Sequence, residues 1–330
     1  MVGDNTNNIV TTWSGPITFG IAPASGGNFF GPVSSGYLNI SGFVSAPGLV
    51  TSVRAGNVRF AGGSDCNELQ IRANTTSLGA NNGISTNAIV DIGGNGSPTV
   101  PTYLDLNGFN QKVLGLKNTV TPANLGMVTN GSATVKTLTL DPGTGNTYSF
   151  DGAVVGNISL VLNSGQQTFT GILATNAYTG NTTVNGGTLE LANASIATGS
   201  TVTIATGATL QLDFSTTNQI GALVLGGASQ SPGVYKNATS PTFITGSGSL
   251  IVVPPVNVTP TNIVASVSGN TLTLTWPTDH TGWKLQAQTN SLGSGLGTNW
   301  VTIPGTAAAN TYNATLNPAN GTVFYRMVYP

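Results

Sequence analysis

The segment from residue 169 to residue 191 constrains the fold most, because it alternates short β-forming runs with residues suited to tight corners. Thr182-Thr183-Val184 is a β-branched run, and Leu189 and Leu191 alternate with polar residues. Between these runs, Asn185-Gly186-Gly187 tolerates the positive φ that a corner requires. Strand, corner and strand make up the repeating unit of a coil, so the segment predicts a stacked β-solenoid.

Similar phrases recur between residues 49 and 253. Val184 and Ile204 are 20 residues apart, and Leu189 and Leu210 are 21 apart, which are repeat lengths typical of solenoids. We therefore expect parallel coils in which aliphatic side chains stack about 4.8 Å apart. A large antiparallel sandwich is the alternative. The phrases that place apolar residues at alternate positions are Asn57–Phe60, Leu69–Arg72, Ala88–Asp91, Tyr103–Leu106, Val135–Leu140, Asn157–Leu162, Leu189–Leu191, Val202–Ile204, Leu210–Leu212 and Leu223–Leu225.

The run from Tyr178 to Leu189 resembles the autotransporter-associated β-strand repeat of secreted bacterial surface proteins. Asn181 stands where that repeat usually has glycine, a change that a left-handed corner tolerates. The resemblance implies a right-handed parallel β-helix that serves as a scaffold, in a family whose repeat is not defined by catalytic residues. It extends over roughly residues 100 to 253 through Leu104–Gln111, Gly233–Tyr235 and Gly246–Leu250.

The composition favours an all-β fold as well. The chain has nine Lys and Arg, ten Asp and Glu and 45 Gly among 330 residues, which makes it poor helix-forming material. It is not typical of disorder, because 39% of its residues are hydrophobic. A net charge of −1 provides no basic surface for phosphates, so nucleic acid is excluded as a predicted partner.

The cysteine content and the hydropathy bear on the compartment. Cys66 is the one cysteine, so no intrachain disulfide forms; a buried inert thiol is favoured over an intermolecular bridge. No run of about 18 apolar residues predicts membrane insertion. The start, Met1-Val2-Gly3-Asp4-Asn5, lacks the pattern of a signal peptide. We expect a processed form of an extracellular or cell-surface protein.

We predict four segments along the chain. Residues 1–48 form an N-terminal cap or assembly segment, and residues 49–253 form the β-solenoid. Residues 254–260 are a Pro-rich linker, because prolines remove hydrogen-bond donors and stiffen the chain. The end of a solenoid exposes unpaired backbone, so we take the aromatic residues Trp13, Phe29 and Phe30 as possible assembly contacts.

Residues 261–330 predict a small β-sandwich. This region resembles immunoglobulin-like or fibronectin type III-like modules through Leu272–Trp276 and Phe324–Tyr329. Trp283 and Trp300 are candidate contacts for a glycan or a partner, with core packing as the alternative. The six expected strands are Ile263–Val267, Thr271–Trp276, Trp283–Gln288, Trp300–Ile303, Thr311–Leu316 and Val323–Tyr329.

Catalytic and metal chemistry have weak sequence support. Asp65 and Glu68 are the densest acidic cluster, with Arg59 and Arg72 near, and a local ion pair on an exposed loop is favoured over a catalytic pair. His280, the one histidine, lies in an expected solvent-exposed turn. Asp65 and Asp91 lie in Gly-rich turns, but the iterated aspartates of calcium-binding repeats are missing. We expect no catalytic residues, metal or cofactor.

The sequence as a whole predicts a non-enzymatic extracellular structural protein. We expect the subunit of a self-assembling surface fibre or an adhesin, with itself as a head-to-tail partner or with a cell-surface glycan or protein. The alternative is a glycan-binding module of a larger secreted surface protein. A polysaccharide-active β-helix enzyme that uses Asp65 and Glu68 ranks third.

Overall fold

The computed structural model describes residues 10–20, 28–31, 36–93, 101–119, 126–171, 176–253, 256–317 and 319–329. The fold is nearly all β, with 49% of residues in strands and 2% in helix. The chain divides into two compact units, Met1–Val253 and Pro254–Pro330. Within the described ranges, no helical segment has the length and apolar character needed to span a bilayer.

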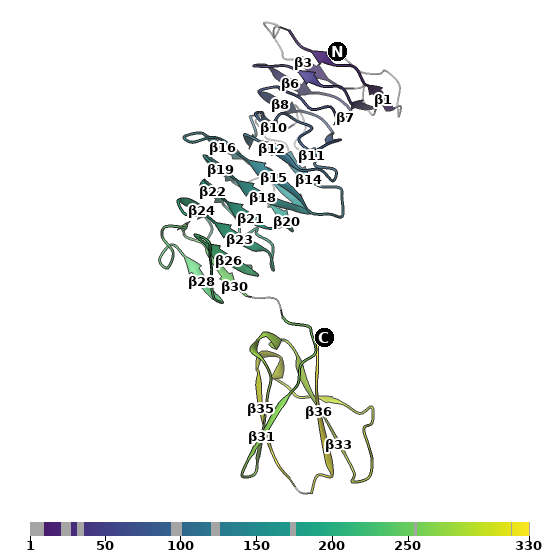
Figure 1. The fold of residues 1–330 in the computed structure, drawn as a ribbon, viewed down its shortest axis with the longest axis vertical. Coiled ribbons are helices and arrows are strands. Elements are labelled where there is room, and N and C mark those ends of the chain that lie inside the picture. Colours follow the sequence, from purple (N-terminus) through teal and green to yellow (C-terminus); the bar gives the residue numbers. More distant parts are fainter. Residues whose placement is uncertain are drawn as a thin grey trace. The chain divides into compact units, whose positions relative to one another are not determined.

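The first unit is a parallel β-solenoid of about eight turns (Figure 1), which confirms the predicted fold class. Its largest sheet contains one strand from each of eight successive turns, all paired in parallel. These strands are β1 (Val10–Trp13), β4 (Tyr37–Ile40), β7 (Asn57–Phe60), β9 (Thr75–Leu78), β11 (Thr102–Asp105), β14 (Gly126–Thr129), β17 (Ala153–Gly156) and β20 (Ala177–Tyr178).

Further sheets complete each turn. One pairs β2 (Ile17–Thr18) with β5 (Val44–Ser45), and a seven-stranded sheet contains β12 (Gln111–Val113), β15 (Lys136–Leu140), β18 (Ile158–Leu162), β21 (Thr182–Val184), β23 (Thr201–Ile204), β26 (Ala222–Leu225) and β27 (Ala228–Ser229). The remaining side is built first from β3 (Asn28–Phe30), β6 (Val50–Val53), β8 (Glu68–Ile71), β10 (Ile89–Ile92) and β13 (Gly115–Lys117), and then from β16 (Thr147–Phe150), β19 (Gln166–Phe169), β22 (Gly187–Leu191), β24 (Ala208–Leu212) and β29 (Ile244–Gly246).

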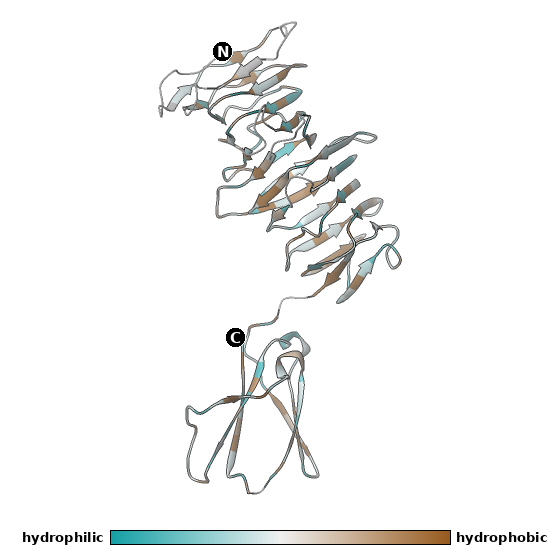
Figure 2. Ribbon diagram, turned by 180° about the vertical axis from the view of Figure 1, so that it is seen from behind, coloured by the Kyte–Doolittle hydropathy of each residue, from teal (hydrophilic) through white to brown (hydrophobic). Residues whose placement is uncertain are grey.

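The predicted repeat lengths are confirmed by the strand register. Val184 lies opposite Ile204, and Leu189 lies opposite Leu210, as direct partners on neighbouring strands. The stacking continues over many turns, and Figure 2 shows hydrophobic residues recurring on the solenoid strands. One buried ladder runs through Val113, Leu140, Leu162, Val184, Ile204 and Leu225.

The corner after β21 shows why glycine is needed there. Gly187 has a φ of 72°, and a Cβ on it would lie 1.9 Å from the carbonyl oxygen of Gly165 in the turn before. Both constraints exclude other side chains. Asn181 differs from the expectation, since it is not among the residues with positive φ. Its side-chain oxygen instead accepts the Thr201 N–H at 2.9 Å, which links two turns.

The two ends of the solenoid differ. The described residues between 10 and 48 belong to the first turns, and β1, β2 and β3 are each the last strand of their sheet. At the other end, β27 pairs with β26 antiparallel, and β28 (Gly233–Lys236) pairs antiparallel with β30 (Ser249–Val252), which also pairs with β25 (Thr217–Ile220). Antiparallel strands therefore end two of the sheets there, whereas β29 ends a third sheet in parallel with β24.

The second unit has two antiparallel three-stranded sheets, consistent with a small β-sandwich. One sheet has the order β31 (Val264–Ser268), β32 (Thr271–Thr275), β35 (Thr311–Thr315), and the other β34 (Val301–Thr302), β33 (Lys284–Asn290), β36 (Thr322–Val328). Its buried core consists of Leu274, Trp276 and Leu285. Short 3-10 turns cover Thr278–His280 (η1) and Thr306–Ala308 (η2).

Candidate functional site

Asp65 and Glu68 do not form a shared site. The Asp65 carboxylate accepts hydrogen bonds from the backbone N–H of Ala46 and from the Ser45 hydroxyl, the latter at 3.1 Å. Glu68 instead forms an ion pair with Lys117 at 2.7 Å. Each acid therefore has its own partner, Asp65 in the turn before it and Glu68 two turns further along the solenoid, and the two carboxylates are not arranged around a common substrate position.

Arg72 and Asp91, which the sequence placed near acidic or Gly-rich segments, form a buried ion pair with each other. Two guanidinium nitrogens donate to the two carboxylate oxygens at 3.0 and 2.7 Å, and the side chains are 6% and 0% exposed. Arg72 also donates to the Gly93 carbonyl at 3.0 Å, and the Thr119 N–H donates to Asp91 at 3.2 Å. Asp91 thus lies in β10 in a buried ion pair, not in a turn.

Other carboxylates join successive turns in the same way. Asp141 accepts a hydrogen bond from Ser164 at 2.5 Å and pairs with Lys112 at 2.7 Å, and these bonds, that of Lys112 first, lower its pKa. Glu190 accepts the Thr168 hydroxyl at 2.9 Å. Within the described ranges, no three His, Cys, Asp or Glu side chains gather as metal ligands. The carboxylates serve as links between turns.

Cys66 is buried, as expected. It is 1% exposed, and burial raises the pKa of its thiol. The hydroxyls of Thr51 and Ser64 interact with the thiol and oppose that shift. A thiol with a raised pKa is protonated at neutral pH and is a poor nucleophile, which agrees with the expectation of an inert side chain.

The expectation that His280 is solvent-exposed is wrong. His280 lies in η1 as a turn residue, but it is only 3% exposed. Its Nε2 lies 2.7 Å from the Thr259 carbonyl oxygen and its Nδ1 2.7 Å from an Asp279 carboxylate oxygen. Both bonds favour the charged imidazolium and raise the pKa of His280. The cause of the burial is the segment 256–260, which folds over the turn.

Trp283 and Trp300 have separate surroundings. Trp283 is 6% exposed, its ring lies 5.3 Å from that of His280 and 5.7 Å from that of Tyr329, and its Nε1 donates to the Asn257 carbonyl at 2.8 Å. Trp300 is partly exposed, with the Arg326 guanidinium carbon 4.3 Å from the ring centroid. Trp283 is therefore a packing residue, and the two rings do not make one binding platform.

The N-terminal aromatic residues also differ in their surroundings. Phe30 is 1% exposed and packs edge-on against Phe60 at 5.6 Å, so it is a core residue and offers no assembly contact. Phe29 lies in β3, and its side chain is outside the described part. Trp13 is 43% exposed in β1, and Phe43, which the sequence interpretation did not single out, is 45% exposed in the next turn.

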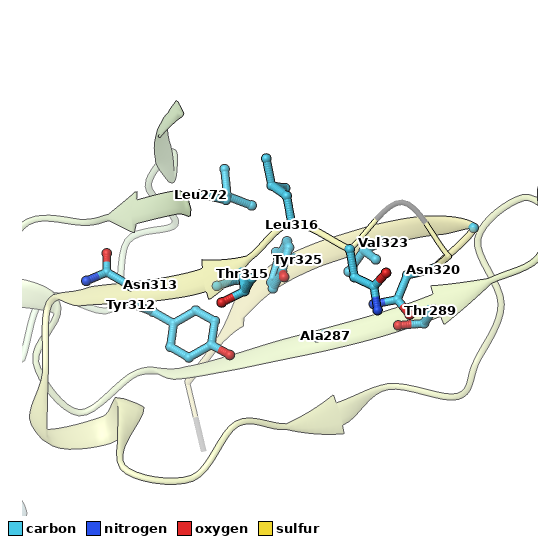
Figure 3. Close-up of a pocket in the computed structure, with 13 residues that line it drawn as sticks. Leu272, Ala287, Thr289, Tyr312, Asn313, Thr315, Leu316, Asn320, Val323 and Tyr325 are labelled. Carbon is cyan, nitrogen blue, oxygen red and sulfur yellow. The ribbon is translucent and has the colours of Figure 1, made fainter. Parts of the chain in front are cut away.

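Sequence reasoning missed a groove between the two sheets of the C-terminal unit. Figure 3 shows its lining side chains, and its volume is about 790 Å³. One signal was present: Ala287 and Ala314 stand at inward positions where larger residues normally fill a sandwich. Its inner wall consists of Leu272, Tyr312 and Ala314 from one sheet and Ala287, Val323 and Tyr325 from the other.

Comparisons with known proteins returned no match to this chain: no family model, no curated protein and no solved structure matches it. The β-solenoid is therefore established by the structure alone.

Proposed function

We propose that this chain is a structural protein that associates head-to-tail with further copies of itself through the N-terminal end of its solenoid. The observation that carries the proposal is that β1, β2 and β3 all stand at the ends of their sheets. Strands at a sheet edge present backbone donors and acceptors to any strand that docks there. A second copy supplies such strands in the geometry that the solenoid already uses.

The exposed aromatic residues also favour the N-terminal end of the solenoid as the interface. In the described part of the solenoid, Trp13 and Phe43 are the large aromatic side chains with more than a third of their surface exposed. They lie in the first two turns, where the Ile17 N–H also donates to the Phe43 carbonyl at 2.9 Å. Aromatic side chains are enriched at the centres of protein interfaces, because they bury much apolar area on binding.

The two ends of the solenoid favour a head-to-tail contact. At the C-terminal end, β27 and β28 are antiparallel edge strands while β29 is a parallel one, so that end differs from the edge at β1–β3, where all three strands pair in parallel. Contacts between unlike surfaces build an open filament unless the rotation between copies closes them into a ring. A net charge of −1 adds little repulsion between copies. An extracellular fibre or adhesin is the setting that fits this chemistry, and the resemblance of Tyr178–Leu189 to a surface-protein repeat supports it.

The test is sedimentation velocity over a concentration series of the full chain. We expect association to rise with concentration, and Trp13→Lys to raise the concentration for half-association by roughly tenfold, the effect of losing one aromatic anchor. Lysine also opposes strand docking at an edge. The matched control is Val135→Lys, at a position 52% exposed in the middle of the solenoid. A wild-type chain that stays monomeric, or equal effects of the two variants, would contradict the proposal.

A further inference from the structure

The groove in the C-terminal unit is a place where the sandwich core is incomplete. The fully packed part of that core is limited to Leu274, Trp276 and Leu285. The next inward positions along β32 and β33 are Leu272 and Ala287. There the space between the two sheets opens into a groove with a volume of about 790 Å³. Volumes between about 300 and 1,000 Å³ are typical of sites that bind small molecules.

The lining of the groove is uncharged and contains uncommitted polar groups. None of its residues is Asp, Glu, Lys, Arg or His. Asn320 from the rim, and the hydroxyls of Tyr312 and Tyr325, make no side-chain hydrogen bond to another described residue. By contrast, amides elsewhere are engaged, as Asn130 is with the carbonyls of Thr134 and Asn157. Amides and phenols can both donate and accept.

The two tyrosine rings form the apolar part of the groove. Their centroids are 6.4 Å apart and the ring planes meet at 52°, so the two rings, one from each sheet, lie next to each other and form one aromatic surface. Partial burial raises the pKa of Tyr325, with a smaller contribution from Tyr312, so the phenol faces a partly dry space and stays protonated. Aromatic faces beside hydroxyl and amide groups suit a ligand that has both apolar and hydroxyl surfaces.

We propose that this groove binds a neutral carbohydrate chain, with a sugar ring against Tyr312 and Tyr325 and the sugar hydroxyls against the tyrosine hydroxyls and the Asn320 amide. Carbohydrates combine apolar C–H faces with many hydroxyls and carry no charge to neutralise, as the lining requires. An acidic saccharide would bring carboxylates into a partly dry site without a cation, which costs free energy. This binding activity goes beyond self-assembly and does not depend on it.

The experiment uses the full chain and titration calorimetry with four neutral hexasaccharides, of β-1,4-glucose, β-1,3-glucose, β-1,4-xylose and β-1,4-mannose, and with a hexamer of galacturonic acid. We expect at least one neutral probe to bind and the acidic probe to bind roughly tenfold more weakly. Ala314→Trp fills the groove and should abolish binding. Tyr325→Phe keeps the ring and removes one hydroxyl, and should weaken binding roughly threefold to tenfold.

The matched control is Trp300→Ala, which removes an aromatic ring that does not line the groove. Its affinity should equal that of the wild type. Far-ultraviolet circular dichroism checks the fold of each variant, and Tyr325→Phe keeps the test valid if Ala314→Trp fails to fold. Absence of binding by all four neutral probes would overturn the proposal, as would equal losses in Trp300→Ala and Tyr325→Phe, or stronger binding of the acidic probe.

Discussion

His280 shows how one side chain can hold a connecting segment against its unit. The residues around it read as a turn, and they do form η1, but burial comes from residues 21 to 23 positions earlier in the chain. Thr259 accepts from the imidazole and Asn257 from the Trp283 indole. The Asn257 N–H also donates to the Asp279 carbonyl at 2.7 Å. Such a return of the chain leaves no trace in the local sequence pattern.

The position of His280 predicts how stability changes with pH. Its folded-state pKa lies above the ordinary value of 6.5, so the stabilisation is complete below about pH 6.5 and is lost as pH rises through the raised pKa. Asp279 has a lowered pKa and stays ionised in this range. We expect the urea midpoint of the C-terminal unit, followed by tryptophan fluorescence, to fall between pH 6 and pH 9.

The control for this prediction is His280→Gln, which cannot titrate. The variant should be less stable than the wild type at pH 6, and its urea midpoint should be flat between pH 6 and pH 9. A wild-type midpoint that is constant or that rises over the same range would show that the imidazole does not carry the effect.

At the scale of the element, the side-chain ladders explain why the strands stack in register. Each inward row meets its counterpart one turn later, so a shift by one residue would bring polar side chains into the core. Several buried polar residues interrupt these rows, among them Thr76 and Thr182. Thr76 lies between Val58 and Leu104 and is fully buried, and its hydroxyl has no hydrogen-bond partner among the described residues. Thr182 is fully buried too, but its hydroxyl lies 2.8 Å from the Tyr178 hydroxyl.

The same substitution should therefore have opposite effects at the two positions. Thr76→Val removes an unsatisfied buried hydroxyl and should stabilise the solenoid by about 1 kcal/mol. Thr182→Val leaves the buried Tyr178 hydroxyl without its partner and should destabilise it by about 1–3 kcal/mol. Urea unfolding followed by circular dichroism measures both. Shifts of the urea midpoint in the same direction would contradict the assignment of the two hydroxyls.

Across the whole molecule, the fold could be predicted from the sequence more completely than the candidate binding surfaces could. The phrase expected at Asn157–Leu162 is β18 at Ile158–Leu162, and the spacing of Val184 and Ile204 proved to be one full turn. Alternation and corner residues are local, so they can be read directly. Contacts between distant segments cannot.

The surfaces depend on those distant contacts. Trp283 looked like a binding residue, but the returning segment at Asn257 covers it. The groove arises because two small residues, Ala287 and Ala314, come from opposite sheets, and their positions are known only once the strands are paired. Asp65 likewise has its partners one turn away in the solenoid and Glu68 has its partner two turns away, which the linear cluster does not show.

Electron microscopy of the purified chain over a concentration series tests head-to-tail association most directly. We expect filaments at high concentration, in which the first turn of each solenoid, with β1, β2 and β3, contacts the next copy. The Trp13→Lys variant should give short assemblies or single particles under the same conditions. Single particles of the wild type at every concentration, or filaments in which β1–β3 face solvent, would contradict it.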